Sequence, residues 1–146
     1  MRELETELEI SAPDTIVWNI LTDFDRYPDW NPFITEIEGR LQENARLQAF
    51  IRPPGSKGMT FKPTILRVAS EREFRWRGRL LFPGLFDGEH IFLIEPINEA
   101  QVRFIQKEIF RGILVPLLWN SLNTSTRQGF MAMNQALKER AEQFSN

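Results

Sequence analysis

Cysteine is absent from this 146-residue chain, and histidine and tyrosine occur only once each. The missing thiols exclude disulfide bonds and thiolate metal sites, and they fit a reducing compartment. Acidic and basic residues nearly balance, with a formal net charge of -2, so no basic excess points to nucleic acid. No apolar run reaches the length of a membrane span, so stable membrane insertion is not expected.

The amino terminus is charged rather than apolar. Arg2, Glu3 and Glu5 stand where a secretory signal would need an apolar region, so a cytoplasmic protein is the default expectation. The length predicts one domain over residues 1–146 with a single core. What the chain has in excess is large rings, with 12 Phe and 4 Trp, which is more than a minimal core requires.

The last stretch predicts a long amphipathic helix from about Pro116 to Phe144. Proline suits the first turn, because its missing N–H would be unpaired there anyway. Beyond it, apolar residues recur at three- and four-residue steps and form one stripe: Leu118, Leu122, Thr126, Phe130, Met133, Leu137, Ala141 and Phe144. Gly129 beside the stripe allows close approach of another layer, whereas Lys138 and Glu142 are expected on the opposite side.

The first third predicts a strand followed by two short helices. Residues 3–10 alternate between glutamates on one side and a second set on the other: Leu4, Thr6, Leu8 and Ile10. Ser11 is a candidate N-cap for a short helix over residues 16–21. The segment Asp23–Phe33 is too rich in proline for one regular helix and predicts short turns pinned by aromatic residues.

The middle of the chain predicts a meander of antiparallel strands with approximate spans 34–42, 45–53, 59–69, 72–80, 87–95 and 101–110. Alternation puts Arg75, Arg77 and Arg79 on one face of their strand and Trp76 on the other. If the first strand lies beside the last, acidic and basic rows alternate across four strands, each pair contributing about 0.2–1 kcal/mol. This order places the amino-terminal strand in the middle of the sheet. It also favours pairing with glutamates over an anionic partner for the arginine row.

These elements predict an α+β fold. One curved antiparallel sheet of about seven strands wraps around the long carboxy-terminal helix, and the two short helices after the first strand close one end. A curved sheet and a single crossing helix do not mesh everywhere. An internal cavity lined by rings is therefore expected between them.

Several stretches carry a family resemblance: Asp23–Phe33, Arg75–Gly78, Pro83–His90, Phe110–Gly112 followed by Pro116–Leu117, and Phe130–Lys138. They resemble the START-like (SRPBCC, helix-grip) proteins of the polyketide cyclase/dehydrase branch, over essentially the whole chain. The resemblance implies a helix-grip fold with a deep pocket for a hydrophobic small molecule. It implies no fixed catalytic set, because members include lipid carriers, cyclases and hydrolases.

The predicted ligand-binding residues are large rings and polar groups, most of them on inward strand phases: Trp18, Trp30, Phe33, Phe74, Trp76, Phe82, Phe86, His90, Phe92, Phe104, Gln106, Glu108, Phe110, Trp119, Phe130 and Met133. The expected partner is a hydrophobic small molecule or lipid. No metal site and no cofactor is predicted, because zinc spacing, a calcium loop and a phosphate-binding glycine loop are all missing from the sequence.

His90 is the candidate for chemistry. Its strand phase puts it near Gln106 and Glu108 of the neighbouring strand, in an otherwise apolar cavity. Such a histidine can act as a general base with the carboxylate, or can orient a ligand hydroxyl or carbonyl. The alternative is a buried polar cluster that only satisfies its own hydrogen bonds. The sequence leaves both interpretations open.

Three function hypotheses follow. The first is binding of a lipid, isoprenoid or polyketide-like molecule in the cavity. The second is a cyclase, dehydratase or hydrolase that uses His90 and Glu108. The third is an interaction module that forms a homodimer through apolar residues on the outer sheet face: Ile91, Leu93, Ile105 and Ile109.

Two loops rich in proline and glycine, Pro53–Gly58 and Phe82–Phe86, are candidate gates. A cavity beneath a continuous sheet and helix has no opening unless a loop moves. Phe82, Leu85 and Phe86 are predicted to fold over the cavity mouth, near Trp30 to Phe33. The alternative is that they fill a satellite core and never open.

Overall fold

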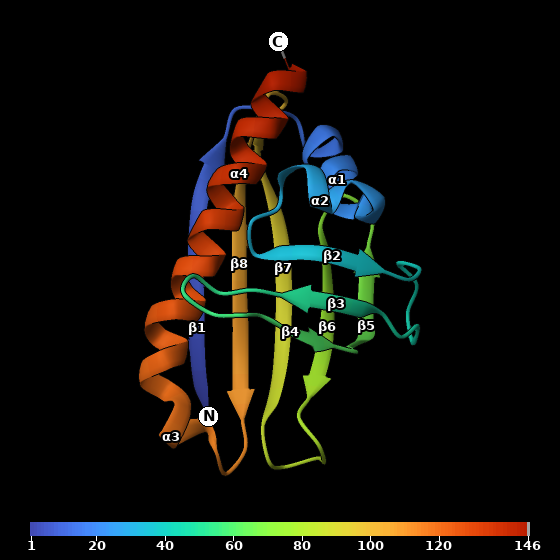
Figure 1. Cartoon of the computed structure of the whole chain (residues 1–146). Helices are drawn as coiled ribbons and strands as arrows, with labels where there is room; N and C mark the ends of the chain where they lie inside the picture. The colour runs from blue at the N-terminus through green and yellow to red at the C-terminus, as the bar shows by residue number, and fades with distance from the viewer. Residues whose placement is uncertain (146) are drawn as a thin grey trace.

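The structure is a computed structural model and describes residues 1–145. Its strands are β1 (Arg2–Ile10), β2 (Ile34–Glu38), β3 (Gln48–Ile51), β4 (Met59–Phe61), β5 (Thr64–Ala69), β6 (Glu73–Arg79), β7 (Asp87–Asn98) and β8 (Gln101–Arg111). Its helical elements are α1 (Asp14–Thr22), η1 (Phe24–Arg26), α2 (Tyr27–Trp30), α3 (Val115–Ser121), the π-helical turn η2 (Leu122–Thr126) and α4 (Arg127–Ser145). A large sheet forms the back layer, and α4 and a small sheet lie in front of it (Figure 1).

The large sheet has the strand order β1-β8-β7-β6-β5, so the predicted pairing of the first strand with the last is confirmed. The predicted charge rows also meet across it. Lys107 lies 4.0 Å from Glu5, and Arg75 lies 3.5 Å from Glu89. The prediction that β1 lies in the middle of the sheet is wrong, because β2 pairs with β3 and leaves β1 at an edge.

The prediction of one continuous sheet is also wrong, because β2, β3 and β4 form a separate three-stranded sheet within the described residues. The predicted strand 59–69 breaks at Pro63, which has no N–H for a ladder, and β5 after it joins the large sheet. β2 ends early because Gly39 has a φ of 126°. The sheets stay connected, since the Leu47 N–H donates to the Pro63 carbonyl at 2.8 Å.

The predicted long helix is interrupted by the π-helical turn η2. One extra residue in a helical turn rotates the stripe by about 100°. Leu118, before the turn, is consequently exposed, whereas the stripe residues of α4 are buried as far as Ala141: Phe130, Met133, Leu137 and Ala141. Gly129 packs against the Phe33 ring, which a Cβ would strike, so the expected close approach is confirmed.

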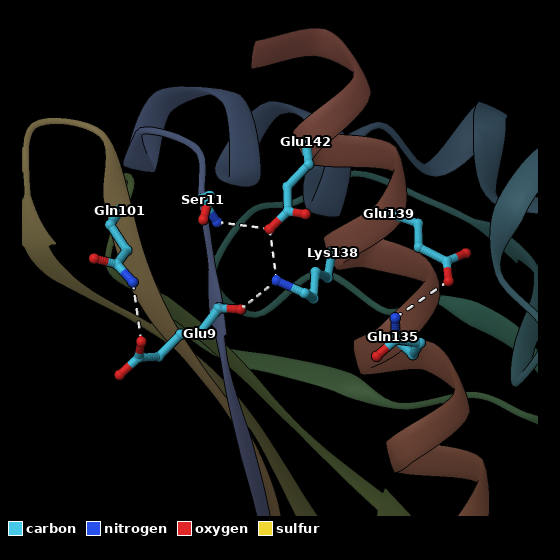
Figure 2. Close-up of polar contacts among 7 residues, drawn as sticks. All are labelled: Glu9, Ser11, Gln101, Gln135, Lys138, Glu139 and Glu142. Carbon is cyan, nitrogen blue, oxygen red and sulfur yellow. Dashed lines mark hydrogen bonds and ion pairs between the residues drawn. The ribbon is translucent and has the colours of Figure 1, made fainter. Parts of the chain in front are cut away.

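The upper part of α4 is tied to the end of β1 by polar contacts (Figure 2). Lys138 Nζ donates to the Glu9 carbonyl at 3.0 Å and to Glu142 Oε2 at 2.6 Å. The Ser11 backbone N–H donates to the same Glu142 oxygen at 2.8 Å. Ser11 is therefore not the N-cap of α1, a place taken by Pro13. Lys138 and Glu142 face β1 instead of lying opposite the buried stripe.

The outer face of the large sheet offers little apolar surface. Ile91 is only 3% exposed and lies in register between Arg75 and Lys107, two residues whose long aliphatic stems commonly cover apolar neighbours. Ile105 is 9% exposed. The homodimer hypothesis thereby loses the exposed apolar patch on which it rested.

The Lys138 ammonium and the Ser11 N–H lower the pKa of Glu142. Since the folded-state pKa is lowered, the contribution of this carboxylate to stability is complete above its unfolded-state pKa. It is lost as the pH falls through the folded-state pKa. We expect Glu142→Gln to lower the free energy of unfolding by about 0.5–1 kcal/mol at neutral pH, and by progressively less in acid.

Urea denaturation at several pH values measures this difference. Glu139→Gln is the matched control, because Glu139 lies on the same helix and contacts only Gln135 in Figure 2. A Glu142→Gln deficit that is unchanged from neutral to acid pH would contradict the assignment.

Candidate functional site

Two glycines face each other where the inner face of the large sheet would otherwise carry side chains. The inner phase of β6 runs from Phe74 through Trp76 to Gly78. Gly78 pairs with Gly88 of β7. Apart from its chain neighbours, no atom of residues 1–145 lies within 4 Å of a Cβ placed on Gly78, whereas a Cβ on Gly88 would strike the Glu108 carboxylate. The glycine pair leaves a hollow and gives Glu108 access to it.

The hollow belongs to a cavity of about 250 Å³. Its walls come from both sheets, the turn η2 and two loops: Phe33, Ile51, Pro53, Ser56, Met59, Phe61, Pro63, Trp76, Gly78, Arg79, Leu80, Phe86, Gly88, His90, Glu108, Phe110, Leu122 and Thr126. Most of these side chains are apolar. The floor is buried, but Ser56, Met59 and Arg79 are exposed, so the cavity opens to solvent there. Ser56 belongs to Pro53–Gly58, one of the two loops expected to act as gates, so this loop lies at the opening.

The polar corner of the cavity is His90 with Glu108. Glu108 sits opposite His90 in the register of β7 and β8, and His90 Nδ1 lies 3.4 Å from Glu108 Oε1. The histidine side chain is 2% exposed and the glutamate side chain 17% exposed. Both line the cavity, so the sequence-based prediction that they converge on an apolar hollow agrees with the geometry.

Behind His90, a chain of hydrogen bonds crosses the core to α4 and β1. His90 Nε2 lies 2.8 Å from Gln106 Oε1, and Gln106 Nε2 donates to Asn134 Oδ1 at 2.7 Å. Asn134 Nδ2 donates to the Thr6 hydroxyl at 2.8 Å. That hydroxyl donates to the Gln106 carbonyl at 3.2 Å. Gln106 and Asn134 are buried, and these bonds offset the cost of burying their amides.

This chain sets the tautomer of His90. Gln106 Nε2 also faces the Phe130 carbonyl at 3.4 Å, and a carbonyl can only accept. The amide oxygen of Gln106 must then face His90, so the neutral imidazole carries its proton on Nε2. Its Nδ1 lone pair is left facing Glu108 and the cavity. In this neutral form, Nδ1 and Glu108 Oε1 are both acceptors where the two side chains line the cavity.

Aromatic rings hold the imidazole in place. The His90 ring stacks on Phe92 with centroids 4.3 Å apart and planes 14° apart. Phe130 lies 4.9 Å away and Trp76 5.4 Å away, edge-on. Rings packed on several sides restrict rotation of His90, so its Nδ1 keeps one direction.

The structure divides the predicted site residues into three groups. The cavity lining includes Phe33, Trp76, Phe86, His90, Glu108 and Phe110. Others are buried behind that lining, as core or as the hydrogen-bond chain: Trp18, Phe74, Phe92, Phe104, Gln106, Phe130 and Met133. The remainder lie elsewhere: Trp30, Phe82 and Trp119.

The residues in the last group have local explanations. Trp30 borders a separate surface hollow with Asp23 and Arg26. The Trp119 ring lies under the Arg2 guanidinium at 5.2 Å. Phe82 is 55% exposed and does not cover the mouth, so the gate prediction is wrong for this residue.

Phe86 is placed differently from Phe82, since it lines the cavity and packs on Phe110 with ring centroids 5.7 Å apart. It shares the cavity wall with Phe33, near which it was predicted to lie. In the aromatic turn, burial raises the pKa of Tyr27, whose hydroxyl donates to the Leu21 carbonyl. That tyrosine is a structural donor.

Sequence reasoning missed the glycine pair, Asn134 and the small-sheet wall. The glycines had a signal, because extending the alternation past Trp76 and His90 puts Gly78 and Gly88 on the inner face. Asn134 had one as well, as a polar residue beside Phe130 and Met133 on the buried part of the helix. The small-sheet wall had none, since it depends on where the chain crosses between sheets.

Comparison with known proteins gives a family and a fold. Residues 1–142 match the model of the family described as polyketide cyclase / dehydrase and lipid transport. No curated protein matches the sequence. Among solved structures, the Zhui aromatase/cyclase from Streptomyces sp. R1128 is similar, with a TM-score of 0.81 and 15% identity over 99% of this chain and 96% of that one.

Two further structures have the same fold. A point mutant of the Thalictrum flavum norcoclaurine synthase has a TM-score of 0.77 and 14% identity, covering 99% of this chain and 96% of that one. A START superfamily protein from Mycobacterium smegmatis has a TM-score of 0.75 and 20% identity, covering 97% and 98%. The predicted α+β helix-grip fold is confirmed.

The tautomer can be read directly by nitrogen NMR, because His90 is the only histidine. We expect the neutral ring to carry its proton on Nε2. Gln106→Leu should allow a mixture of tautomers and lower the free energy of unfolding by about 1–3 kcal/mol, since His90 and Asn134 each lose a buried partner.

Gln101→Leu is the control, because it makes the same change in the same strand, where the side chain contacts Glu9 (Figure 2). Protonation of Nδ1 in the wild-type protein, or an unchanged tautomer in Gln106→Leu, would contradict the assignment.

Proposed function

The chain belongs to the polyketide cyclase / dehydrase and lipid transport family, and from this premise we propose that it binds a compact hydrophobic molecule in the cavity at Gly78 and Gly88. The observation that carries the proposal is that the inward positions Gly78 and Gly88 have no side chains. A strand pair that gives up two inward side chains loses packing, so the hollow is costly unless something fills it. The walls, with Phe33, Trp76 and Phe110, suit an apolar occupant.

The size of the cavity limits the occupant. Its volume of about 250 Å³ lies just below the range of ligand pockets, which is roughly 300–1,000 Å³. A molecule of one or two rings, or a short isoprenoid, fits this volume better than a lipid with two acyl chains. A longer molecule can extend toward the opening at Ser56, Met59 and Arg79.

The polar corner selects the functional group of the ligand. His90 Nδ1 and Glu108 both accept hydrogen bonds, so they favour a hydroxyl donor over a carbonyl oxygen. A buried acceptor left without a donor costs about 1–3 kcal/mol, which gives a hydroxylated ligand an advantage. On composition we place the protein in the cytoplasm as a single domain without a nucleic-acid partner.

Filling the hollow tests the binding proposal. We expect Gly78→Leu to weaken binding of β-naphthol at least about tenfold, because the new side chain occupies the apolar space that the ligand needs. Isothermal titration calorimetry measures the affinity, and thermal denaturation shows that the variant folds.

Arg77→Leu is the matched control, since it adds the same side chain one residue earlier on the opposite face of β6. If Gly78→Leu binds as tightly as the wild type, the ligand occupies another site and the proposal fails.

A second candidate function is proton transfer to and from a bound ketone. The pair of acceptors at the polar corner supports it, because such a pair can hold a proton taken from carbon beside a carbonyl. The electron pair of the C–H bond moves toward the carbonyl oxygen and forms an enolate, and a proton returns from the pair. The similar structures include an aromatase/cyclase, which is compatible with this chemistry.

Deuterium exchange tests this candidate without knowledge of the natural substrate. In heavy water, the wild-type protein is expected to accelerate exchange into β-tetralone about a hundredfold over Glu108→Gln or His90→Ala. Glu89→Gln, on the outer face of the sheet, is the control. Equal exchange rates for the wild type and Glu108→Gln would rule out proton transfer by Glu108, and the site would then only bind its ligand.

A further inference from the structure

One end of the molecule carries an exposed apolar surface that the cavity does not explain. We define the apolar tip as Leu81 and Phe82 of the β6–β7 loop, Ile113 just before α3 and Leu117 in the first turn of α3. Their exposed fractions are 85%, 55%, 73% and 80%. These segments lie at the bottom of Figure 1, at the opposite end from the C-terminus. Four large apolar side chains gathered at one end are more than the scattered exposure of an ordinary surface.

The apolar tip is a built surface, because its two loops are bonded to each other. The Ile113 N–H donates to the Gly84 carbonyl and the Leu114 N–H to the Leu85 carbonyl, both at 3.1 Å. Gly112, with a φ of 132°, lies so close to the Leu85 backbone that a Cβ would strike it. The two loops are therefore held beside each other by their backbones.

Leu81 is an unfavourable residue for stability alone. Its φ is 66°, in the left-handed region that costs a non-glycine residue free energy and that glycine and asparagine adopt more easily. It is also the most exposed of the four side chains. A leucine that is both strained and exposed at the apex of a loop points to a role outside the fold.

The strand ends next to the apolar tip are basic. Arg79, Arg111 and Arg2 lie at this end of β6, β8 and β1, and all three are exposed. Asp87 is the acidic residue in register with Arg79 and Arg111. Three guanidinium groups against two carboxylates, Asp87 and the exposed Glu3 that follows Arg2, leave this end with a local positive charge, although the whole chain has a formal net charge of -2.

We propose that the apolar tip docks the protein on an anionic lipid surface. The exposed side chains enter the interfacial region, and the arginines meet the anionic headgroups, a combination typical of peripheral membrane binding. A second copy of the chain fits less well, because it would bring two sets of arginines together. No helix among the described residues is long and apolar enough to cross a bilayer. Docking would be shallow and reversible.

The apolar tip is continuous with the cavity wall. Leu80 and Phe86, at the two ends of the same loop, line the cavity. Docking would bring this wall to the lipid surface, where an apolar molecule is most concentrated. The docking itself does not depend on the proposed ligand, so each can fail without the other.

Vesicle sedimentation with the full chain tests the proposal. We expect binding to vesicles of equal parts phosphatidylcholine and phosphatidylserine, weaker binding to phosphatidylcholine alone, and loss of the difference in high salt. Phe82→Ser and Leu81→Asn should each weaken binding by about three- to tenfold. Phe144→Ser is the matched control, because Phe144 is 62% exposed at the other end of the molecule.

Leu81→Asn separates docking from folding. Asparagine tolerates the left-handed backbone, so thermal stability should stay equal or rise while vesicle binding falls. No binding of the wild type to the anionic vesicles would overturn the proposal. So would an equal loss in Phe144→Ser, or self-association of the wild type that Phe82→Ser abolishes.

Discussion

The amide of Gln106 is the interaction on which the site depends. It connects the large sheet to α4 by donating to Asn134 and to the Phe130 carbonyl, and it accepts from His90. Because both amide ends are occupied, the amide cannot reverse without breaking buried hydrogen bonds. A structural contact between sheet and helix is thereby also the contact that turns the His90 lone pair toward the cavity.

The rest of the cavity follows from what the large sheet omits. Gly78 and Gly88 remove two side chains from the inner face beside Trp76, and the small sheet, offset from α4, closes part of the space with Ile51 and Phe61. Elsewhere the same face is densely packed with rings such as Phe74 and Phe92. The protein therefore combines a rigid aromatic core at one end of the sheet with an opening at the other. A substitution that fills the hollow would stabilise the fold, but it would also remove the site.

Local alternation was sufficient to predict the strands that carry the polar corner. Period-two patterning placed His90, Gln106 and Glu108 on facing strands, because each strand has one buried face and a register slip would expose it. Alternation was not sufficient to predict features that depend on a missing side chain or on the route of the chain between the two sheets. The break at Pro63, the π-helical turn and the second sheet set the cavity walls. None of them has a periodic signal.

A crystal structure of the protein with β-naphthol tests the central claim most directly. The account predicts the rings against Gly78 and Gly88, with the hydroxyl within hydrogen-bond distance of His90 Nδ1 or Glu108. A cavity filled by the protein's own side chains, or naphthol bound with its hydroxyl away from His90, would contradict it.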